Sequence, residues 1–207
     1  MTRRGRALLR VGSLAGAALV WIVVDSRSEP WELGRDVALL RGTGWLACAA
    51  LLLSLVMSPL GRLHGWWILH RGQGSSQRTV VGSWAAYRRA FGVVAGCGAA
   101  LHAAVALSTY LWTSWRALLE VPYLRSGTVA LWLLLALLVT SFRGPVVAMG
   151  LVGWKSLHRL AYVAAALVLH HLLLAPFAPR GLTLVVFGLT AVVAPLRWLR
   201  ARRVPPR

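Results

Sequence analysis

The chain has 207 residues, of which 58% are hydrophobic and 14% are charged, and its mean hydropathy is +0.66. A soluble domain carries about 25% charged residues, so the composition excludes an ordinary soluble protein. The net charge of +18 does not indicate nucleic-acid binding, because the basic residues sit at the ends of apolar runs and no nucleic-acid-binding motif is present. We therefore expect one polytopic membrane domain over residues 1–207.

Apolar runs of the length that crosses a bilayer, roughly 17–25 residues, recur along the whole chain. They predict an all-α membrane helix bundle with six transmembrane helices, at about 7–24, 43–60, 90–112, 127–148, 156–176 and 181–199. Polar connectors are expected at 25–42 and 61–89, and shorter loops near 113–126, 143–155 and 177–181.

The distribution of Lys and Arg predicts that both termini lie in the cytoplasm. In that orientation 17 of the 23 basic residues fall on the cytoplasmic side and all five acidic residues fall outside. The sequence has neither a Walker A motif nor a G-x-G-x-x-G turn after a strand. We expect no nucleotide-binding domain in the chain, so its chemistry needs partner proteins.

Four of the six histidines lie in or at the edge of predicted spans: His102 in the third, and His158, His170 and His171 in the fifth. An ionisable side chain in a span is costly and usually marks a site, although a single histidine can serve as an interhelical hydrogen bond. Zinc would usually gather carboxylates or thiolates as well, and none are close. Haem needs only one or two axial ligands in apolar surroundings, so the pattern favours haem between helices.

The spacing of these histidines separates them in depth. His158 and His171 are 13 residues apart, which is roughly 20 Å along a helix. His102 reaches the outer half of the third span, level with His170 and His171. The sequence predicts an outer site of His102 with one of that pair, and an inner position at His158. At about 100° per residue an ideal helix does not choose between His170 and His171.

Four segments carry a resemblance to a known family: YRRAFGVVAGCGAALH (87–102), LVTSFRG (138–144), WKSLHRLAYVAAALVLHH (154–171) and RGTGWLACAALLLSLVMSPLGRL (41–63). Together they resemble the ferric reductase-like transmembrane domain family. Within it, the pattern is most similar to the haem-binding membrane subunit of the bacterial periplasmic methionine sulfoxide reductase system. The similarity covers roughly residues 7–176.

This resemblance implies a multi-pass protein of the cell inner (plasma) membrane that holds one or two b-type haems, with FMN or quinone as a further cofactor. Electrons would pass from quinol or a cytoplasmic flavin reductase to a periplasmic reductase subunit that carries molybdopterin. The expected partners are these proteins and membrane lipid, with no nucleic acid. The chain would be an electron-transfer subunit of an oxidoreductase rather than an autonomous enzyme.

The resemblance also implies roles for individual residues. His102 and His171 match the axial ligands of the outer haem iron, and His158 matches a ligand of an inner one. Where the two-haem branch has another histidine, this chain has Arg88 or Arg89.

An inner haem would therefore need a second ligand such as His64 or His70. Arg88 would instead meet haem propionates or anionic lipid. Tyr162, one turn after His158, would hydrogen-bond a propionate or quinol, or serve as an ordinary interfacial aromatic residue.

Two other functions fit parts of the pattern. The first is a transmembrane oxidoreductase of the same fold that reduces external ferric or cupric chelates. The second is a haem-free transporter or assembly factor in which the histidines relay protons. A proton relay would need carboxylates within the membrane, and all five acidic residues are predicted to lie outside it.

Overall fold

The computed structural model describes residues 3–27, 32–70, 77–111, 115–176 and 178–193. These ranges contain α1 (Arg3–Arg27), α2 (Glu32–His70), α3 (Gln77–Ala106), the π-helical turn η1 (Leu107–Leu111), α4 (Ala117–Glu120), α5 (Pro122–Val139), α6 (Arg143–Leu157), α7 (Leu160–Leu174) and α8 (Arg180–Val193). No strand occurs in the ranges described. The predicted all-α fold is confirmed.

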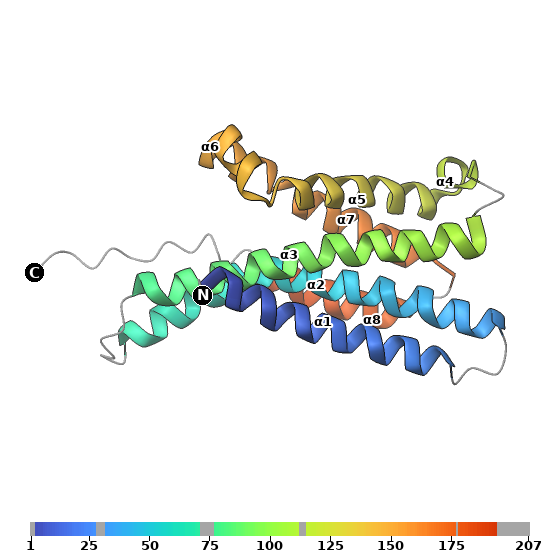
Figure 1. Cartoon of the computed structure of the whole chain (residues 1–207), viewed down its shortest axis with the longest axis horizontal. Coiled ribbons are helices and arrows are strands. Elements are labelled where there is room, and N and C mark those ends of the chain that lie inside the picture. Colours follow the sequence, from blue (N-terminus) through green and yellow to red (C-terminus); the bar gives the residue numbers. More distant parts are fainter. Residues whose placement is uncertain (1–2, 28–31, 71–76, 112–114, 177, 194–207) are drawn as a thin grey trace, which may run out of the picture.

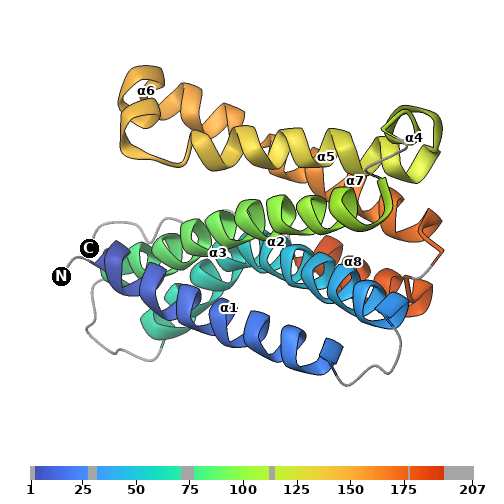
Figure 2. The same ribbon diagram turned by 45° about the vertical axis from the view of Figure 1, so that its right-hand side comes forward.

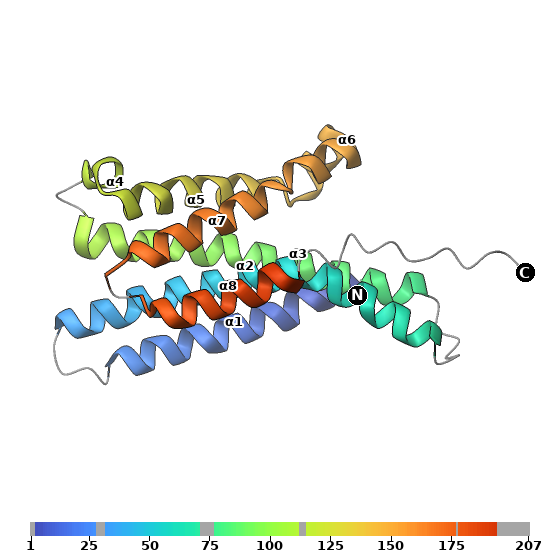
Figure 3. The same cartoon turned by 180° about the vertical axis from the view of Figure 1, so that it is seen from behind.

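The long helices form an up-and-down bundle in two layers. Helices α1, α2 and α3 lie side by side, and α5 and α7 form a second layer over them (Figures 1 and 2). Seen from behind, α8 runs along the outside of α2, and it contacts both α2 and α7 (Figure 3). The start of α1 and helix α6 lie at one end of the bundle, and α4 lies at the other (Figure 1). Helix α5 contacts both α3 and α7, so it brings these two helices together.

Small residues allow the helices to approach closely. This is usual in membranes, because lipid tails are as apolar as the side chains and helices associate through close packing instead of the hydrophobic effect. Gly98 of α3 faces Ala47 of α2, and an added Cβ there would lie 3.2 Å from the Cβ of Ala47. The central core draws on five helices, with buried residues such as Leu51, Ala95, Leu134, Ala164 and Phe187. Large apolar side chains cover the outside of the bundle, including Leu14 and Trp21 of α1. Outward apolar faces of this kind are typical of contact with lipid.

Within the described residues, four helices are long and apolar enough to cross a membrane, at Gly5–Arg27, Gly34–Trp67, Ser83–Leu111 and Pro122–Val139. Helices α6 and α7 together make a fifth candidate, bent by 46°. Helix α8 has 14 described residues and is shorter than the predicted span at 181–199, whose end lies outside the described residues. The chain is a multi-pass membrane protein, and the count of six spans stays a prediction.

The structure corrects the boundaries of the fourth span and the loop after it. The helix expected to reach residue 148 ends at Val139. There the hydroxyls of Thr140 and Ser141 donate to the carbonyls of Ala136 and Leu137, both at 2.7 Å. Side chains that bond to backbone carbonyls in this way can replace the helical hydrogen-bond pattern.

Residues 143–155, expected to be a loop, are instead mostly helix α6. Its apolar residues continue past the turn, and the chain breaks only at Gly150, whose φ of 68° lies in the left-handed region that glycine readily adopts. The predicted connectors at 25–42 and 61–89 are also shorter than expected, because α2 extends over Glu32–His70. The polar residues near both ends of α2 are part of the helix and do not form loops.

Candidate functional site

His102 lies on α3 and bonds to the backbone of α2. Its Nδ1 is 3.0 Å from the carbonyl oxygen of Leu40. A carbonyl oxygen only accepts, so Nδ1 carries a proton, and in the neutral imidazole Nε2 then keeps its lone pair. Among the residues that the structure describes, Nε2 of His102 has no hydrogen-bond partner. The ring is thus held by one nitrogen, and the other nitrogen is available as a potential ligand atom.

Gly44 makes this contact feasible. It stands four residues after Leu40, so it lies one helical turn above the carbonyl that His102 uses. A Cβ at Gly44 would lie 3.0 Å from both Cε1 and Nδ1 of His102. The buried Thr43 completes the contact, with its Oγ1 3.5 Å from Nδ1 of His102 and 3.2 Å from the Leu40 carbonyl. Any larger residue at position 44 would push against the imidazole.

His171 lies on α7 and is held in the same way by α5. Its Nδ1 is 2.8 Å from the carbonyl oxygen of Tyr123, in the first turn of α5. Gly127 stands four residues after Tyr123, and a Cβ there would lie 2.7 Å from Nδ1 of His171. The buried Ser126 donates to the same carbonyl at 2.9 Å. By the same reasoning Nε2 of His171 keeps its lone pair, and within the described part of the chain it has no hydrogen-bond partner.

These two helix pairs therefore repeat one construction, which we call the carbonyl–glycine cradle: Leu40, Thr43 and Gly44 for His102, and Tyr123, Ser126 and Gly127 for His171. In each cradle a carbonyl accepts from the imidazole, a hydroxyl residue follows at the third position and a glycine at the fourth. The sequence signal is a Ser or Thr directly before a glycine in the first third of a long apolar helix. Sequence reasoning missed these residues, because neither glycine is near a histidine along the chain.

The two cradles bring the imidazole rings of His102 and His171 next to each other, in an edge-on arrangement. Their ring centroids are 6.3 Å apart and the ring planes are inclined by 83°. A metal–imidazole bond of about 2.0–2.1 Å places the centres of two rings on opposite sides of one metal roughly 6 Å apart. No group of three His, Cys, Asp or Glu side chains that could hold a metal occurs among the described residues. A pair of neutral imidazoles without further ligands fits haem iron better than zinc.

His170 takes no part in this arrangement. Its side chain is exposed, whereas that of His171 is half-buried against α5. The structure thus separates two adjacent residues that helical rotation alone left equivalent, and it places His171 opposite His102.

His158 lies at the other end of the bundle, where α6 meets α7. Its Nδ1 is 3.1 Å from the carbonyl of Trp154, and its Nε2 is 3.3 Å from the hydroxyl of Ser141. The indole ring of Trp154 packs on the imidazole with centroids 4.2 Å apart. The indole N–H donates to the carbonyl of Thr140 at 2.9 Å. Both ring nitrogens therefore lie against groups of the α5–α6 turn and of α6 itself.

The remaining predicted residues lie away from this pair of imidazoles. Arg88 donates to the hydroxyl of Ser58 at 3.2 Å, so it links α3 to α2. Arg89 donates to the carbonyl of Ser141 in the turn beside His158. Tyr162 packs at the edge of the central core.

The two histidines considered as second inner ligands lie on α2. His64 is exposed and accepts from the indole N–H of Trp84 at 3.2 Å. The side chain of His70 lies outside the described residues. The structure therefore brings no second histidine to His158 within its described part.

Comparison with known proteins gives the family. Residues 43–169 match the family described as ferric reductase like transmembrane component, so the match includes His102 and His158 and stops two residues before His171. The chain is 38% identical over 134 residues to the protein-methionine-sulfoxide reductase heme-binding subunit MsrQ of Deinococcus radiodurans, covering 62% of this chain and 58% of that protein.

Other relatives carry the same name. The subunit of Azospira oryzae is 34% identical over 145 residues, covering 65% of this chain and 54% of that protein. That of Rhodospirillum rubrum is 30% identical over 205 residues, covering 97% of this chain and 90% of that protein. The chain spans little more than half the length of the first two relatives and nearly all of the third. As its motifs predicted, the chain belongs to the ferric reductase-like transmembrane family.

Proposed function

We propose that this chain is the haem-binding electron-transfer subunit of a membrane oxidoreductase, with His102 and His171 as the two axial ligands of one b-type haem. The observation that carries the proposal is the adjacent pair of imidazoles, 6.3 Å between centroids, each anchored through Nδ1 and presenting Nε2. The names of the relatives, which are heme-binding subunits, support it.

The chain's own residues would fix the ligands before any cofactor arrives. The carbonyls of Leu40 and Tyr123 select the tautomer and the orientation of each imidazole. Gly44 and Gly127 allow the rings to reach those carbonyls. The apolar helices around the pair limit access of water. A bound haem supplies one-electron redox chemistry, and its potential depends on ligation and surroundings of this kind.

The requirement for an uncovered imidazole nitrogen favours one haem over two. A ligand histidine must present a nitrogen that no other group covers, and the Ser141 hydroxyl lies 3.3 Å from Nε2 of His158 while Nδ1 bonds to the Trp154 carbonyl. The polar cluster of Ser141, Trp154 and Arg89 around it would have to open before iron could bind. We therefore assign His158 to the junction of α5, α6 and α7, and Arg88 to the contact between α2 and α3.

The orientation proposed from the sequence completes this function. One domain over residues 1–207 would cross the bacterial inner membrane six times with both termini in the cytoplasm. Both cradles lie near the starts of α2 and α5, which then face the periplasm. Electrons would enter from quinol or from a flavin reductase, with FMN or quinone as the intermediate carrier. They would leave to a periplasmic methionine sulfoxide reductase.

Optical spectroscopy tests the central claim. Purified wild-type protein should show a b-type band in a reduced-minus-oxidised spectrum, and the His102→Ala, His171→Ala double variant should lack it. The His170→Ala variant is the matched control, since it removes the adjacent, exposed imidazole. A band that survives in the double variant, or one lost equally in the control, contradicts the assignment of the ligands.

The family description itself favours one alternative acceptor, an external ferric chelate. The two acceptors can be compared in membranes that contain the chain and lack any periplasmic reductase. Under the main proposal these membranes reduce ferric chelates no faster than membranes containing the His102→Ala variant. Faster, histidine-dependent reduction would indicate a metal reductase instead.

A further inference from the structure

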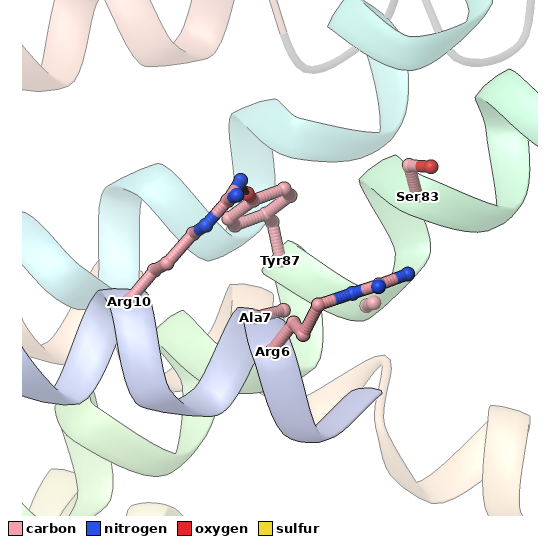
Figure 4. Close-up of a pocket in the computed structure, with 6 residues that line it drawn as sticks. Arg6, Ala7, Arg10, Ser83 and Tyr87 are labelled. Carbon is pink, nitrogen blue, oxygen red and sulfur yellow. Dashed lines mark hydrogen bonds between the residues drawn. The ribbon is translucent and has the colours of Figure 1, made fainter. Parts of the chain in front are cut away.

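A polar pocket lies between α1 and α3, at the end of the bundle where α1 begins and away from the two cradles. It is lined by Arg6, Ala7 and Arg10 of α1 and by Ser83, Ala86 and Tyr87 of α3, and its volume is about 220 Å³. Figure 4 shows both arginines beside α3, with Arg10 ending at the Tyr87 hydroxyl. Such a volume exceeds that of a few water molecules, at about 30 Å³ each.

Small side chains form the floor of this pocket. Ala7 is 2% exposed and Ala86 is 8% exposed, and both belong to a buried cluster with Val11 and Ala90. Because these residues are small, α1 and α3 pack closely below the pocket, while the long arginine and tyrosine side chains stand around its rim. The pocket is apolar at depth and polar at its mouth, which matches the boundary between acyl chains and headgroups.

The charges at the mouth are positive, and the residues that line the pocket include no acidic one. Nη1 of Arg10 donates to the hydroxyl oxygen of Tyr87 at 3.0 Å, which leaves the phenolic proton and the remaining guanidinium protons to donate elsewhere. Arg6 is exposed and has no hydrogen-bond or ion-pair partner among the described residues.

The acidic residues that the structure places are remote from this mouth. Asp25 is at the far end of α1, about 22 Å from Arg10 along the helix. Glu32, Asp36 and Glu120 also lie at the opposite end of the bundle in the part described. Two guanidinium groups, a phenol and a hydroxyl therefore line a space that no carboxylate of the described residues fills. That donor set is suited to the oxygens of a phosphate group.

We propose that this pocket binds the phosphate of an anionic phospholipid, with Arg6 and Arg10 as the charged donors and Tyr87 as the orienting one. The lipid would fasten α1 to α3 at this end of the bundle, where helix packing rests on alanines. The inference is independent of the haem assignment. The same chemistry suits a soluble phosphate, so the experiment must separate the two sources.

Native mass spectrometry of the full chain, titrated with phosphatidylglycerol in detergent, measures the site directly. We expect the Arg6→Gln, Arg10→Gln variant to bind phosphatidylglycerol roughly 30-fold more weakly, from about 1 kcal/mol for each basic residue near a lipid surface. The matched control, Arg62→Gln with Lys155→Gln, removes two exposed basic residues outside the pocket and should bind like wild type. Wild-type binding by the pocket variant, or an equal loss in the control, overturns the site.

Two single variants keep the test decisive if the double variant does not fold, as judged by circular dichroism. Tyr87→Phe removes only the hydroxyl, and Arg10→Lys keeps the charge but loses the planar fork. Each should weaken lipid binding several-fold, and unchanged affinity in both overturns the proposal.

Millimolar inorganic phosphate is the second probe. It should leave lipid binding unchanged, and competition at that concentration would overturn the lipid assignment in favour of a soluble phosphate compound.

Discussion

The histidines at the two ends of the bundle have the same chemistry and different surroundings. His102 and His171 each bond through Nδ1 to the backbone of a neighbouring helix, and each keeps Nε2 without a partner in the described structure. His158 bonds through Nδ1 to its own helix and has Nε2 against Ser141. The difference teaches that a histidine in a membrane helix becomes a plausible metal ligand when the protein anchors one nitrogen and leaves the other unused.

The largest expected effect separates the two ends directly. We expect His171→Ala to reduce haem per protein to background, because it removes an axial ligand. His158→Ala should leave haem per protein at the wild-type value. A pyridine haemochrome assay on the two purified variants makes the comparison. Loss of about half the haem in His158→Ala would show instead that His158 holds a second one.

The next effect tests the cradle glycines. Gly127→Ala places a Cβ 2.7 Å from Nδ1 of His171 and should displace the ring, which lowers haem affinity roughly 10–100-fold, as loss of a ligand's supporting contact typically does. Gly44→Ala, with its Cβ 3.0 Å from His102, should have a similar or smaller effect. Haem titration of the apoprotein and the electron paramagnetic resonance signature of the oxidised protein would report it.

The matched control for the glycines is Gly92→Ala. Gly92 also lies within α3, and an added Cβ there meets nothing within 4 Å. Alanine is the better helix former, so this variant should be equally or more stable and should bind haem like wild type. If all three substitutions behave alike, the glycines have no special relation to the imidazoles.

A smaller effect is expected at the His158 end, and on stability rather than haem. Trp154→Phe removes the indole N–H that donates to the Thr140 carbonyl. The unpaired group should lower the free energy of unfolding by roughly 1–3 kcal/mol. Thermal denaturation measures the loss, with Trp132→Phe as control, since Trp132 is 67% exposed on α5. A loss of haem without a loss of stability would place the haem site at this end.

The smallest effect is expected from the hydroxyls of the cradles. Ser126→Ala removes a hydrogen bond to the Tyr123 carbonyl, which also accepts from His171. Thr43→Val removes hydrogen bonds to the Leu39 carbonyl and to the Leu40 carbonyl, and the latter also accepts from His102. Each should change haem affinity by less than about tenfold and shift the midpoint potential slightly, since one such bond contributes about 0.5–1.5 kcal/mol. Ser108→Ala, whose hydroxyl bonds to Val105 on an exposed surface, should change neither.

Hydropathy predicted the helical class and the position of the early spans well, because lipid requires long apolar helices whatever their neighbours. It misplaced the end of the fourth span, since an apolar run does not reveal that Thr140 and Ser141 close the helix. It also missed α6, whose left-handed Gly150 looked like part of a loop.

For the site, the sequence paired His102 with one of His170 and His171, and it chose His171 only through family resemblance. The structure brings the rings of His102 and His171 together, and their role as haem ligands stays a proposal. Rotation about an ideal helix could not separate His170 from His171. The packing of α7 on α5 does so, by burying one imidazole and exposing the other. Thr43, Gly44, Ser126 and Gly127 were beyond prediction, because each acts on a histidine 44 to 59 residues away in sequence.

The sequence by itself determined that this protein is an all-helical membrane bundle of the ferric reductase-like family with histidines inside its spans. Apolar runs, charge placement and local motifs are properties of consecutive residues, so they can be identified from the sequence without a structure. Only the tertiary structure decided which histidines lie next to each other, which nitrogen each one uses, and where arginines line a pocket. Those features depend on contacts between helices, and a carbonyl of α2 or α5 meets its imidazole only after α3 and α7 have packed beside it.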